Sequence, residues 1–133
     1  MAIHRFSIAT RARVEMVDIT RTISEAVIHS GVMEGICLVY VPHTTAGVMI
    51  NENADPDVTA DIVRELNQVI PFEDHYRHGE GNSAAHIKSS LIGPSVTIPI
   101  QAGRLLLGTW QAIYFGEFDG PRTRTFFAKV MVG

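Results

Sequence analysis

The hydrophobic residues of the first half of the chain fall into strand-like patterns. Apolar positions recur at even spacing over residues 3–16, run without interruption over 35–41 and resume over 46–52, which predicts three strands. The run over 35–41 lacks the alternation of a half-exposed strand. A continuous apolar run is typical of a strand covered on both faces, so we expect this strand to lie in the middle of its sheet.

Helical spacing and helix-start signals predict helices between these strands and after them. Asp18 or Thr20 can cap a first helix that runs to about Ser30, and Gly31 after it suits the left-handed conformation that ends many helices. Asp55-Pro56 starts a second helix, because the carboxylate can cap free N–H groups and proline has no N–H to leave unpaired. Asn82 or Ser83 can cap a short third helix.

The C-terminal third is strand-like. Valine and isoleucine alternate over 96–100, a long apolar stretch with aromatics covers 104–115, and a turn at Asp119-Gly120-Pro121 leads into a last strand over 122–132. Strands joined by short turns favour antiparallel pairing. We therefore predict an α+β fold, a single domain over 1–133 with a mainly antiparallel sheet of about six strands and two to three helices grouped on one face.

Composition and charge narrow the classes of partner. The 11 Lys and Arg against 14 Asp and Glu give a net charge of −3, and the basic residues are scattered, so we expect no nucleic-acid partner. No apolar run approaches the ~18 residues that cross a bilayer, which predicts a cytoplasmic protein with no membrane association. The single cysteine excludes an internal disulfide, and Cys37 lies in an apolar run, where we expect a buried thiol.

Two segments, 42–47 and 78–90, concentrate polar side chains among small residues, which lets another molecule approach closely. They contain His43, His78 and His86. Three neutral imidazoles and one open position are the usual ligand set of catalytic zinc, so these histidines are candidate ligands of a divalent metal, with zinc favoured and magnesium possible. Their spacing matches no recognised zinc motif, and the alternative is that they cap turns or bond to the backbone.

A further polar cluster, Asn51-Glu52-Asn53-Ala54-Asp55, follows the strand over 46–52. Its carboxylates could act as a general base, as partners of a metal-bound imidazole or as oxygen ligands for Mg²⁺. Asp55 also has the competing role of helix cap. Glu52 and Asn53 have no evident structural role, so all three remain candidate catalytic residues.

Anion-binding groups are present as well. Lys88-Ser89-Ser90 is similar to the tail of a phosphate loop, although the glycines that precede such a tail are missing. The helix start near Ser83 offers free N–H groups, so we expect a phosphate beside Lys88, Ser83 or the hydroxyls of Thr44-Thr45. Arg122 and Arg124 stand two apart on a strand and so share a face, which suits them to clamp an anion or a carboxylate of another subunit.

The segment Gly108-Thr109-Trp110-Gln111 places the single tryptophan in the long apolar stretch. A tryptophan in a strand is usually a core residue, and a wall for a flat ring is its alternative role. The amide of Gln111 must satisfy donors and an acceptor where it is buried, which makes it a candidate site residue.

Five motifs in this chain occur in the same order in the YjbQ-like family. They are Pro42-His43-Thr44-Thr45-Ala46, Asn51-Glu52-Asn53-Ala54-Asp55-Pro56, the segment from His78 to His86-Ile87-Lys88-Ser89-Ser90, Gly108-Thr109-Trp110-Gln111 and Asp119-Gly120-Pro121-Arg122. The chain resembles that family over essentially its whole length.

The resemblance implies a small α+β protein that forms a homotrimer and has secondary thiamine-phosphate synthase activity. That reaction joins an aminopyrimidine pyrophosphate to a thiazole phosphate and releases pyrophosphate. The resemblance also implies metal bound to histidines. It places the shared polar residues at His43, Glu52, Asn53, Asp55, His78, His86, Lys88, Trp110 and Gln111.

Two other functions remain open at this point. One is a zinc-type hydrolase of a small phosphate or amide compound, in which Glu52 or Asp55 would be the base. The other is a trimeric module that binds a small ligand or a metal without turnover. A small molecule that bears a phosphate group is the expected substrate of the synthase and of the hydrolase.

Overall fold

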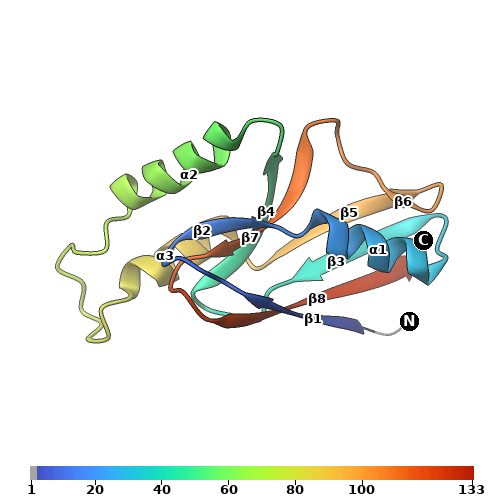
Figure 1. Ribbon diagram of the computed structural model, residues 1–133. Helices are drawn as coiled ribbons and strands as arrows, with labels where there is room; N and C mark the ends of the chain where they lie inside the picture. The colour runs from blue at the N-terminus through green and yellow to red at the C-terminus, as the bar shows by residue number, and fades with distance from the viewer. Residues whose placement is uncertain (1–2) are drawn as a thin grey trace.

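Eight strands and three helices form residues 3–133, the part of the chain that the computed structural model describes (Figure 1). The strands make two sheets, and every pairing within them is antiparallel. The five-stranded sheet has the order β1 (Ile3–Ala9), β8 (Thr123–Val132), β3 (Gly35–Tyr40), β5 (Ser95–Gln101) and β6 (Arg104–Leu105). The three-stranded sheet has the order β2 (Glu15–Asp18), β7 (Gln111–Glu117) and β4 (Ala46–Glu52).

The hydrophobic core lies between the two sheets. The rings of Phe115 on β7 and Phe126 on β8 meet there with their centroids 6.0 Å apart, and both side chains are buried. Strand β3 is the middle strand of its sheet, as its continuous apolar run predicts, and Val39 is fully buried. Cys37 on the same strand is also fully buried, so the prediction of a buried thiol is confirmed, and burial raises the pKa of this thiol to about 11.

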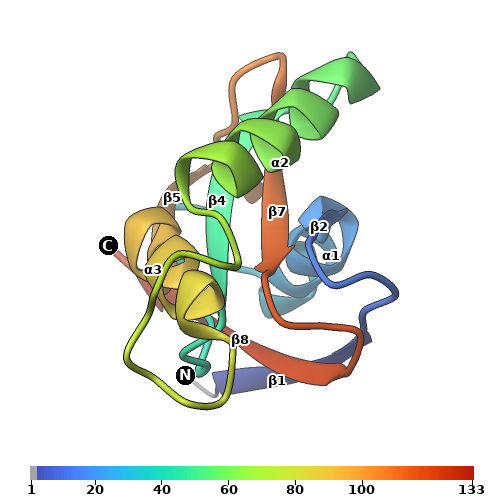
Figure 2. The same ribbon diagram turned by 90° about the vertical axis from the view of Figure 1, so that its left-hand side faces the viewer.

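Helices α2 and α3 lie beside the three-stranded sheet, whereas α1 contacts strands of both sheets (Figure 2). Helix α1 (Thr20–Ser30) inserts Ile23 and Val27 into the core. Helix α3 (Ser83–Ile92) packs along β4, where the Ser89 hydroxyl donates to Ala46 O at 2.6 Å. Helix α2 (Pro56–Val69) contacts β2, but none of its residues is buried. No helix in the described part of the chain is long and apolar enough to cross a membrane.

The α+β class and the antiparallel pairing are confirmed, but the prediction of a single sheet is wrong. The predicted strand over 3–16 breaks into β1 and β2, which belong to different sheets. The break is fixed by backbone hydrogen bonds across the end of the molecule, because Thr10 N donates to Arg122 O and Gly120 N donates to Arg13 O. A change of sheet within one apolar pattern leaves no mark on the periodicity.

The helix ends agree only in part with the predicted caps. Gly31 has φ +72°, as predicted for the end of α1. The cap position at the start of α1 is Ile19 and not Asp18 or Thr20, although Asp18 Oδ1 accepts a hydrogen bond from Thr20 N. Asn82 at the start of α3 makes no capping bond, so that prediction is wrong. Its side-chain amide donates instead to Asp119 Oδ2 at 2.9 Å, because the turn after β7 lies against the helix start.

Candidate functional site

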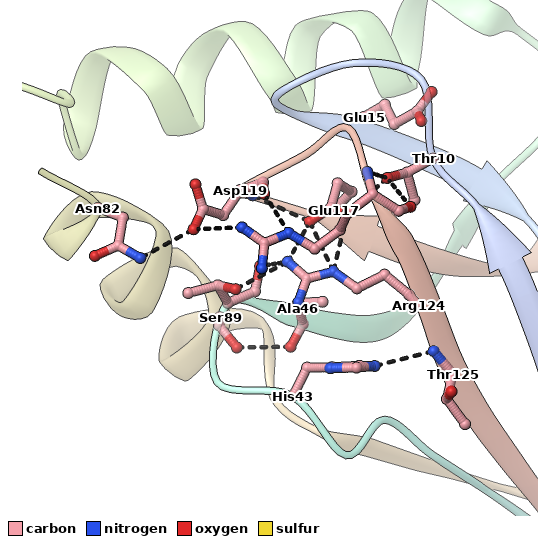
Figure 3. Close-up of polar contacts among 12 residues, drawn as sticks. Thr10, Glu15, His43, Ala46, Asn82, Ser89, Glu117, Asp119, Arg124 and Thr125 are labelled. Carbon is pink, nitrogen blue, oxygen red and sulfur yellow. Dashed lines mark hydrogen bonds and ion pairs between the residues drawn. The ribbon is translucent and has the colours of Figure 1, made fainter. Parts of the chain in front are cut away.

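At one end of the two sheets, a carboxylate and a guanidinium are buried together. Glu117 at the end of β7 is 0% exposed, and Arg124 on β8 is 3% exposed. Arg124 Nη2 lies 2.5 Å from Glu117 Oε2, and Arg124 Nε lies 2.9 Å from Glu117 Oε1, which makes a two-pronged ion pair (Figure 3). The pair joins the three-stranded sheet to the five-stranded sheet.

Further hydrogen bonds satisfy the remaining groups of this ion pair. The Thr10 hydroxyl and Asp119 N donate to Glu117 at 2.7 and 3.0 Å, and Arg124 Nη2 donates to Thr45 Oγ1 at 2.8 Å. Burial alone would raise the pKa of Glu117, but the hydrogen bonds from Arg124, Thr10 and Asp119 outweigh burial and hold this pKa below its usual value. Glu117 is therefore ionised at neutral pH, and the pair fixes the turn that carries Thr45.

An outer layer of contacts connects this end of the sheets to α3. Asp119 Oδ2 accepts from Asn82 Nδ2 at 2.9 Å and from Arg122 Nη2 at 3.1 Å (Figure 3). The Arg122 side chain is 49% exposed, whereas that of Arg124 is buried. The prediction that the two arginines share a face is wrong, because β8 begins at Thr123 and Arg122 still belongs to the turn.

His43 lies just before β4 and points toward β8 (Figure 3). Its Nε2 accepts a hydrogen bond from Thr125 N at 3.0 Å, so the neutral ring carries its proton on Nδ1. Burial and the nearby charge of Arg124 lower the pKa of His43 below 6.5, so the ring is neutral at pH 7. The next two residues differ: Thr44 is exposed, and Thr45 is buried against Arg124.

The other two candidate histidines face each other beside the loop that joins α2 to α3. The rings of His78 and His86 have centroids 5.6 Å apart and are nearly perpendicular at 85°. They border a hollow of about 440 Å³, which is lined by Tyr76, Arg77, His78, Ser83, His86 and Ile87. A second hollow of about 520 Å³ shares Tyr76 and His78 and continues along the loop. We call the first of these the α3 hollow.

The three predicted metal ligands do not come together within one chain. Among residues 3–133, no group of three or more His, Cys, Asp or Glu side chains is placed to hold a metal ion. His78 and His86 remain a pair of nitrogen donors, and the Glu80 carboxylate lies 3.6 Å from His78 Nε2. His43 does not join them, because its Nε2 is bonded to Thr125. The donors present therefore fit part of a zinc site and not the predicted three-histidine set.

Lys88 is turned into the protein interior and does not reach the surface. Its side chain is 0% exposed, and Nζ donates to Ile70 O at 2.8 Å. Nζ also lies 3.8 Å from the centroid of the Phe72 ring, which the guanidinium of Arg13 approaches to 3.5 Å. Burial and, to a smaller extent, the charge of Arg13 lower the pKa of Lys88 to about 8. Lys88 is therefore not placed to contact a phosphate at the surface, and its ammonium is bonded instead to Ile70 O at the end of α2.

The serines beside Lys88 also bond within the chain. The Ser89 hydroxyl donates a hydrogen bond to Ala46 O, and the Ser90 hydroxyl donates to His86 O at 2.9 Å. The close approach of α3 to β4 requires a glycine at position 47, since a Cβ there would lie 2.6 Å from Gly93 O. The segment after His86 is therefore a packing surface, and its similarity to a phosphate loop is misleading.

The remaining predicted residues gather at the opposite end of β4 and β7. Glu52 pairs with Gln111 in the sheet, and Asn53 N donates to Trp110 O at 3.0 Å. Trp110 is 62% exposed, so the prediction of a core position in a strand is wrong. The strand starts only at Gln111, because its Oε1 accepts from Gly108 N at 2.8 Å and closes a turn before it. The exposed Gln111 amide is thus engaged locally.

Asp55 caps α2, as its position before proline predicts. Its Oδ1 accepts from Asp57 N at 2.9 Å. We expect Asp55→Ala to lower the free energy of unfolding by about 1 kcal/mol, and Asp55→Asn, which keeps a capping oxygen, to change it far less. Urea unfolding followed by circular dichroism measures both. Equal stabilities for the two variants would contradict the capping role.

Sequence reasoning missed Glu117 and Thr10, which build the buried network, and placed Asp119 in a turn and a shared motif without a site role. One signal could have found Glu117, since it is a carboxylate inside the otherwise apolar run 112–118. A charge in such a run requires a buried partner of opposite sign. Thr10 leaves no comparable signal, because threonine is common beside turns, whereas the motif that begins at Asp119 could have drawn attention to it.

Two antiparallel sheets with a polar network at one end and a histidine-bearing loop beside it define a small α+β sandwich protein. The chain belongs to the UPF0047 family, since residues 4–133 match the sequence model described as UPF0047 protein YjbQ-like. This match confirms the family resemblance that the motifs indicate.

Relatives and solved structures agree with this membership. The UPF0047 protein YugU of Bacillus subtilis is 54% identical over 125 residues, which cover 93% of this chain and 95% of that protein. A UPF0047 protein of Methanocaldococcus jannaschii is 55% identical and is covered to 92%, with 96% of this chain aligned. A crystal structure of an uncharacterised YjbQ/UPF0047 protein from Clostridium acetobutylicum has a TM-score of 0.95 at 53% identity and covers 96% of this chain and 99% of its own.

Proposed function

We propose that this protein is an enzyme of the thiamine-phosphate synthase type, which joins an aminopyrimidine pyrophosphate to a thiazole phosphate. The observation that supports this most is the lining of the α3 hollow. Arg77, His78, Ser83 and His86 border one space. The Glu80 carboxylate lies beside it, 3.6 Å from His78 Nε2, where it can orient that ring. Guanidinium, imidazole and hydroxyl groups are the donors that bind phosphate oxygens in proteins.

The start of α3 adds to this preference for anions. Ser83 is the first residue of a ten-residue helix, whose free N–H groups carry partial positive charge. Asn82 holds this helix start against Asp119, which the buried ion pair of Glu117 and Arg124 fixes in turn. The network is thus a support for the hollow rather than a part of its surface.

The proposed reaction needs stabilisation of a leaving group more than proton transfer. The thiazole nitrogen forms a bond to the methylene carbon of the pyrimidine, and the bond from that carbon to the pyrophosphate oxygen breaks. The pyrophosphate leaves with the bonding electron pair, so its negative charge rises in the transition state. Arg77 and the imidazole N–H groups of His78 and His86 would stabilise that charge from the hollow.

A divalent metal remains a part of the proposal. His78 and His86 would hold it as nitrogen ligands, which favours zinc over magnesium. A bound metal would supply further positive charge to pyrophosphate. Metal analysis of protein purified without a histidine tag measures this, with His29→Ala on α1 as the control for His86→Ala. We expect His86→Ala to lose the metal and His29→Ala to retain it.

A homotrimer in the cytoplasm is also part of the proposal. The outer face of the five-stranded sheet supports it, because Ile36 and Tyr40 on β3 are exposed there, and Phe127 beside them lines a hollow of about 260 Å³. An exposed apolar patch of this kind is more often covered by another protein chain than left in contact with solvent.

Pyrophosphate release from the two phosphorylated substrates tests the proposed activity. We expect release only when both substrates are present, and a loss of about 100-fold in His86→Ala, which is the scale of one catalytic side chain. His29→Ala should keep wild-type activity. Release from the pyrimidine substrate alone would instead favour a hydrolase, and unchanged activity in His86→Ala would rule out the α3 hollow as the site.

A further inference from the structure

The candidate site residues of this chain divide into two groups at opposite ends of β4 and β7. We call one group the histidine end, with members His43, His78, Ser83, His86 and Arg122. We call the other the tryptophan end, with members Glu52, Asn53, Asp55, Trp110 and Gln111. Strand β4 runs from Ala46 beside the first group to Glu52 in the second, paired throughout with β7 (Figure 1).

The two ends are too far apart to act on one small molecule. Six residue steps separate Ala46 from Glu52, and at about 3.3 Å a step this spans about 20 Å. Ala46 pairs with Glu117 and Glu52 with Gln111, so β4 and β7 keep one register, without a bulge, over this length. A single chain therefore offers a substrate one of the two groups at a time.

The tryptophan end has the surface of a contact region. Trp110 is 62% exposed and Leu106 in the same connection is 52% exposed. Helix α2 starts from this end beside Asp55 and has an apolar stripe of valine, isoleucine and leucine, yet no residue of the helix is buried. A large exposed aromatic beside an incompletely covered amphipathic helix is typical of an interface.

The charged side chains at the histidine end are opposite in sign to those at the tryptophan end. Its hollow is lined by Arg77 and by two imidazoles, whereas the tryptophan end carries Glu52 and Asp55. None of Arg77, Glu52 and Asp55 takes part in an ion pair within residues 3–133. Ile87, on the rim of the hollow, is 43% exposed and offers apolar surface for an aromatic side chain.

The geometry points to a site shared between copies, in which the tryptophan end of one chain packs against the histidine end of a second copy. Glu52 and Trp110 of one copy then face the α3 hollow of the next. Such a head-to-tail contact uses different surfaces on its two sides and closes into a ring. The substrate part of this inference rests on the proposed function, whereas the contact itself does not.

Mixed oligomers test the shared site. We expect Glu52→Gln and His86→Ala each to lose pyrophosphate release when expressed alone. When the two variants are co-expressed in equal amounts, Glu52 is intact in half of the chains and His86 in the other half. About a quarter of the contacts then join an intact tryptophan end to an intact histidine end, so about a quarter of wild-type activity should return. No recovery from the mixture, or full activity of Glu52→Gln alone, would overturn the shared site.

The fluorescence of Trp110 tests the contact without any assumption about activity. It is the single tryptophan of the chain, so its emission reports this position alone. We expect the native protein to shield it from iodide quenching, although a lone chain leaves it 62% exposed. Leu106→Glu should make Trp110 accessible and reduce the sedimentation coefficient, whereas His29→Glu on α1, away from both ends of β4 and from the outer face of the larger sheet, should change neither.

The outcomes separate the two ideas. If the wild-type protein releases no pyrophosphate but Trp110 is shielded and Leu106→Glu dissociates the assembly, the proposed function fails and the contact stands. If Trp110 is quenched by iodide as freely in the native protein as in urea, the contact is absent, whatever the activity.

Discussion

Replacing Glu117 with glutamine is expected to lower the free energy of unfolding by about 3–5 kcal/mol. The reason is that Arg124, 3% exposed, keeps its charge in the interior after its counter-charge is gone. Glutamine preserves the size of the side chain, so the loss reports the charge and its hydrogen bonds rather than a cavity. Urea unfolding at pH 7 measures the change.

The exposed ion pair of Arg21 and Glu25 on α1 supplies the matched control. Their side chains are 92% and 67% exposed, and such pairs contribute less than about 1 kcal/mol. Glu25→Gln should therefore leave the unfolding midpoint nearly unchanged. Equal effects of Glu117→Gln and Glu25→Gln would contradict the structural role of the buried pair.

The same network predicts the direction of the pH dependence. The folded protein holds the pKa of Glu117 below its ordinary value of 4.5, so the unfolded chain binds a proton there more readily. The stabilisation is complete above pH 4.5 and is lost as the pH falls through the lower pKa of the folded state. Glu117→Gln should remove this part of the acid sensitivity.

Lys88→Met is expected to act in the opposite direction and to stabilise the protein at pH 7 by about 1–3 kcal/mol. The ammonium of Lys88 is fully buried beside Phe72 and Ile70, and it has no carboxylate partner among residues 3–133. Methionine has a similar shape and needs no counter-charge. The gain should exceed the loss of one hydrogen bond to Ile70 O.

This gain should shrink as the pH rises. Lys88 has its pKa lowered from 10.5 to about 8 in the folded state, so the unfolded chain binds more protons between those two values. Wild-type stability therefore rises with pH across this window, while the methionine variant lacks that rise. Unfolding curves at pH 7 and pH 10 test it, with Lys129→Met as the control for removal of a lysine. A constant difference between Lys88→Met and wild type would contradict the buried charge.

The local pattern predicted the elements of this fold better than their assembly. The start of α2 at Asp55-Pro56, the end of α1 at Gly31 and the central place of β3 all depend on residues close together in sequence. The division into two sheets depends on hydrogen bonds between Thr10 and Arg122, which are 112 positions apart. Periodicity carries no information about such a pair.

The candidate site shows the same limit. The motif around His78 and His86 was found from composition, and the structure brings those two rings together. The role of Lys88 could not be predicted, because a lysine in a polar motif indicates an anion site unless the burial of its side chain is known. The predicted core position of Trp110 was wrong because an apolar stretch does not show where its strand begins. The hydrogen bond between Gly108 N and Gln111 Oε1 closes a turn there and leaves Trp110 before the strand.

The order of strands in the larger sheet has a consequence for the synthesis of this protein. Among the strands of residues 3–133, β1 is synthesised before the others, and its one partner is β8, which is synthesised after them, through contacts such as Phe6 with Phe126. The nascent chain must therefore keep an unpaired, half-apolar strand until residues 123–132 emerge. Sequence separation of this size slows folding and prolongs exposure to aggregation. A ribosome stalled before β8 should hold a chain that chaperones bind and that proteases cut within β1.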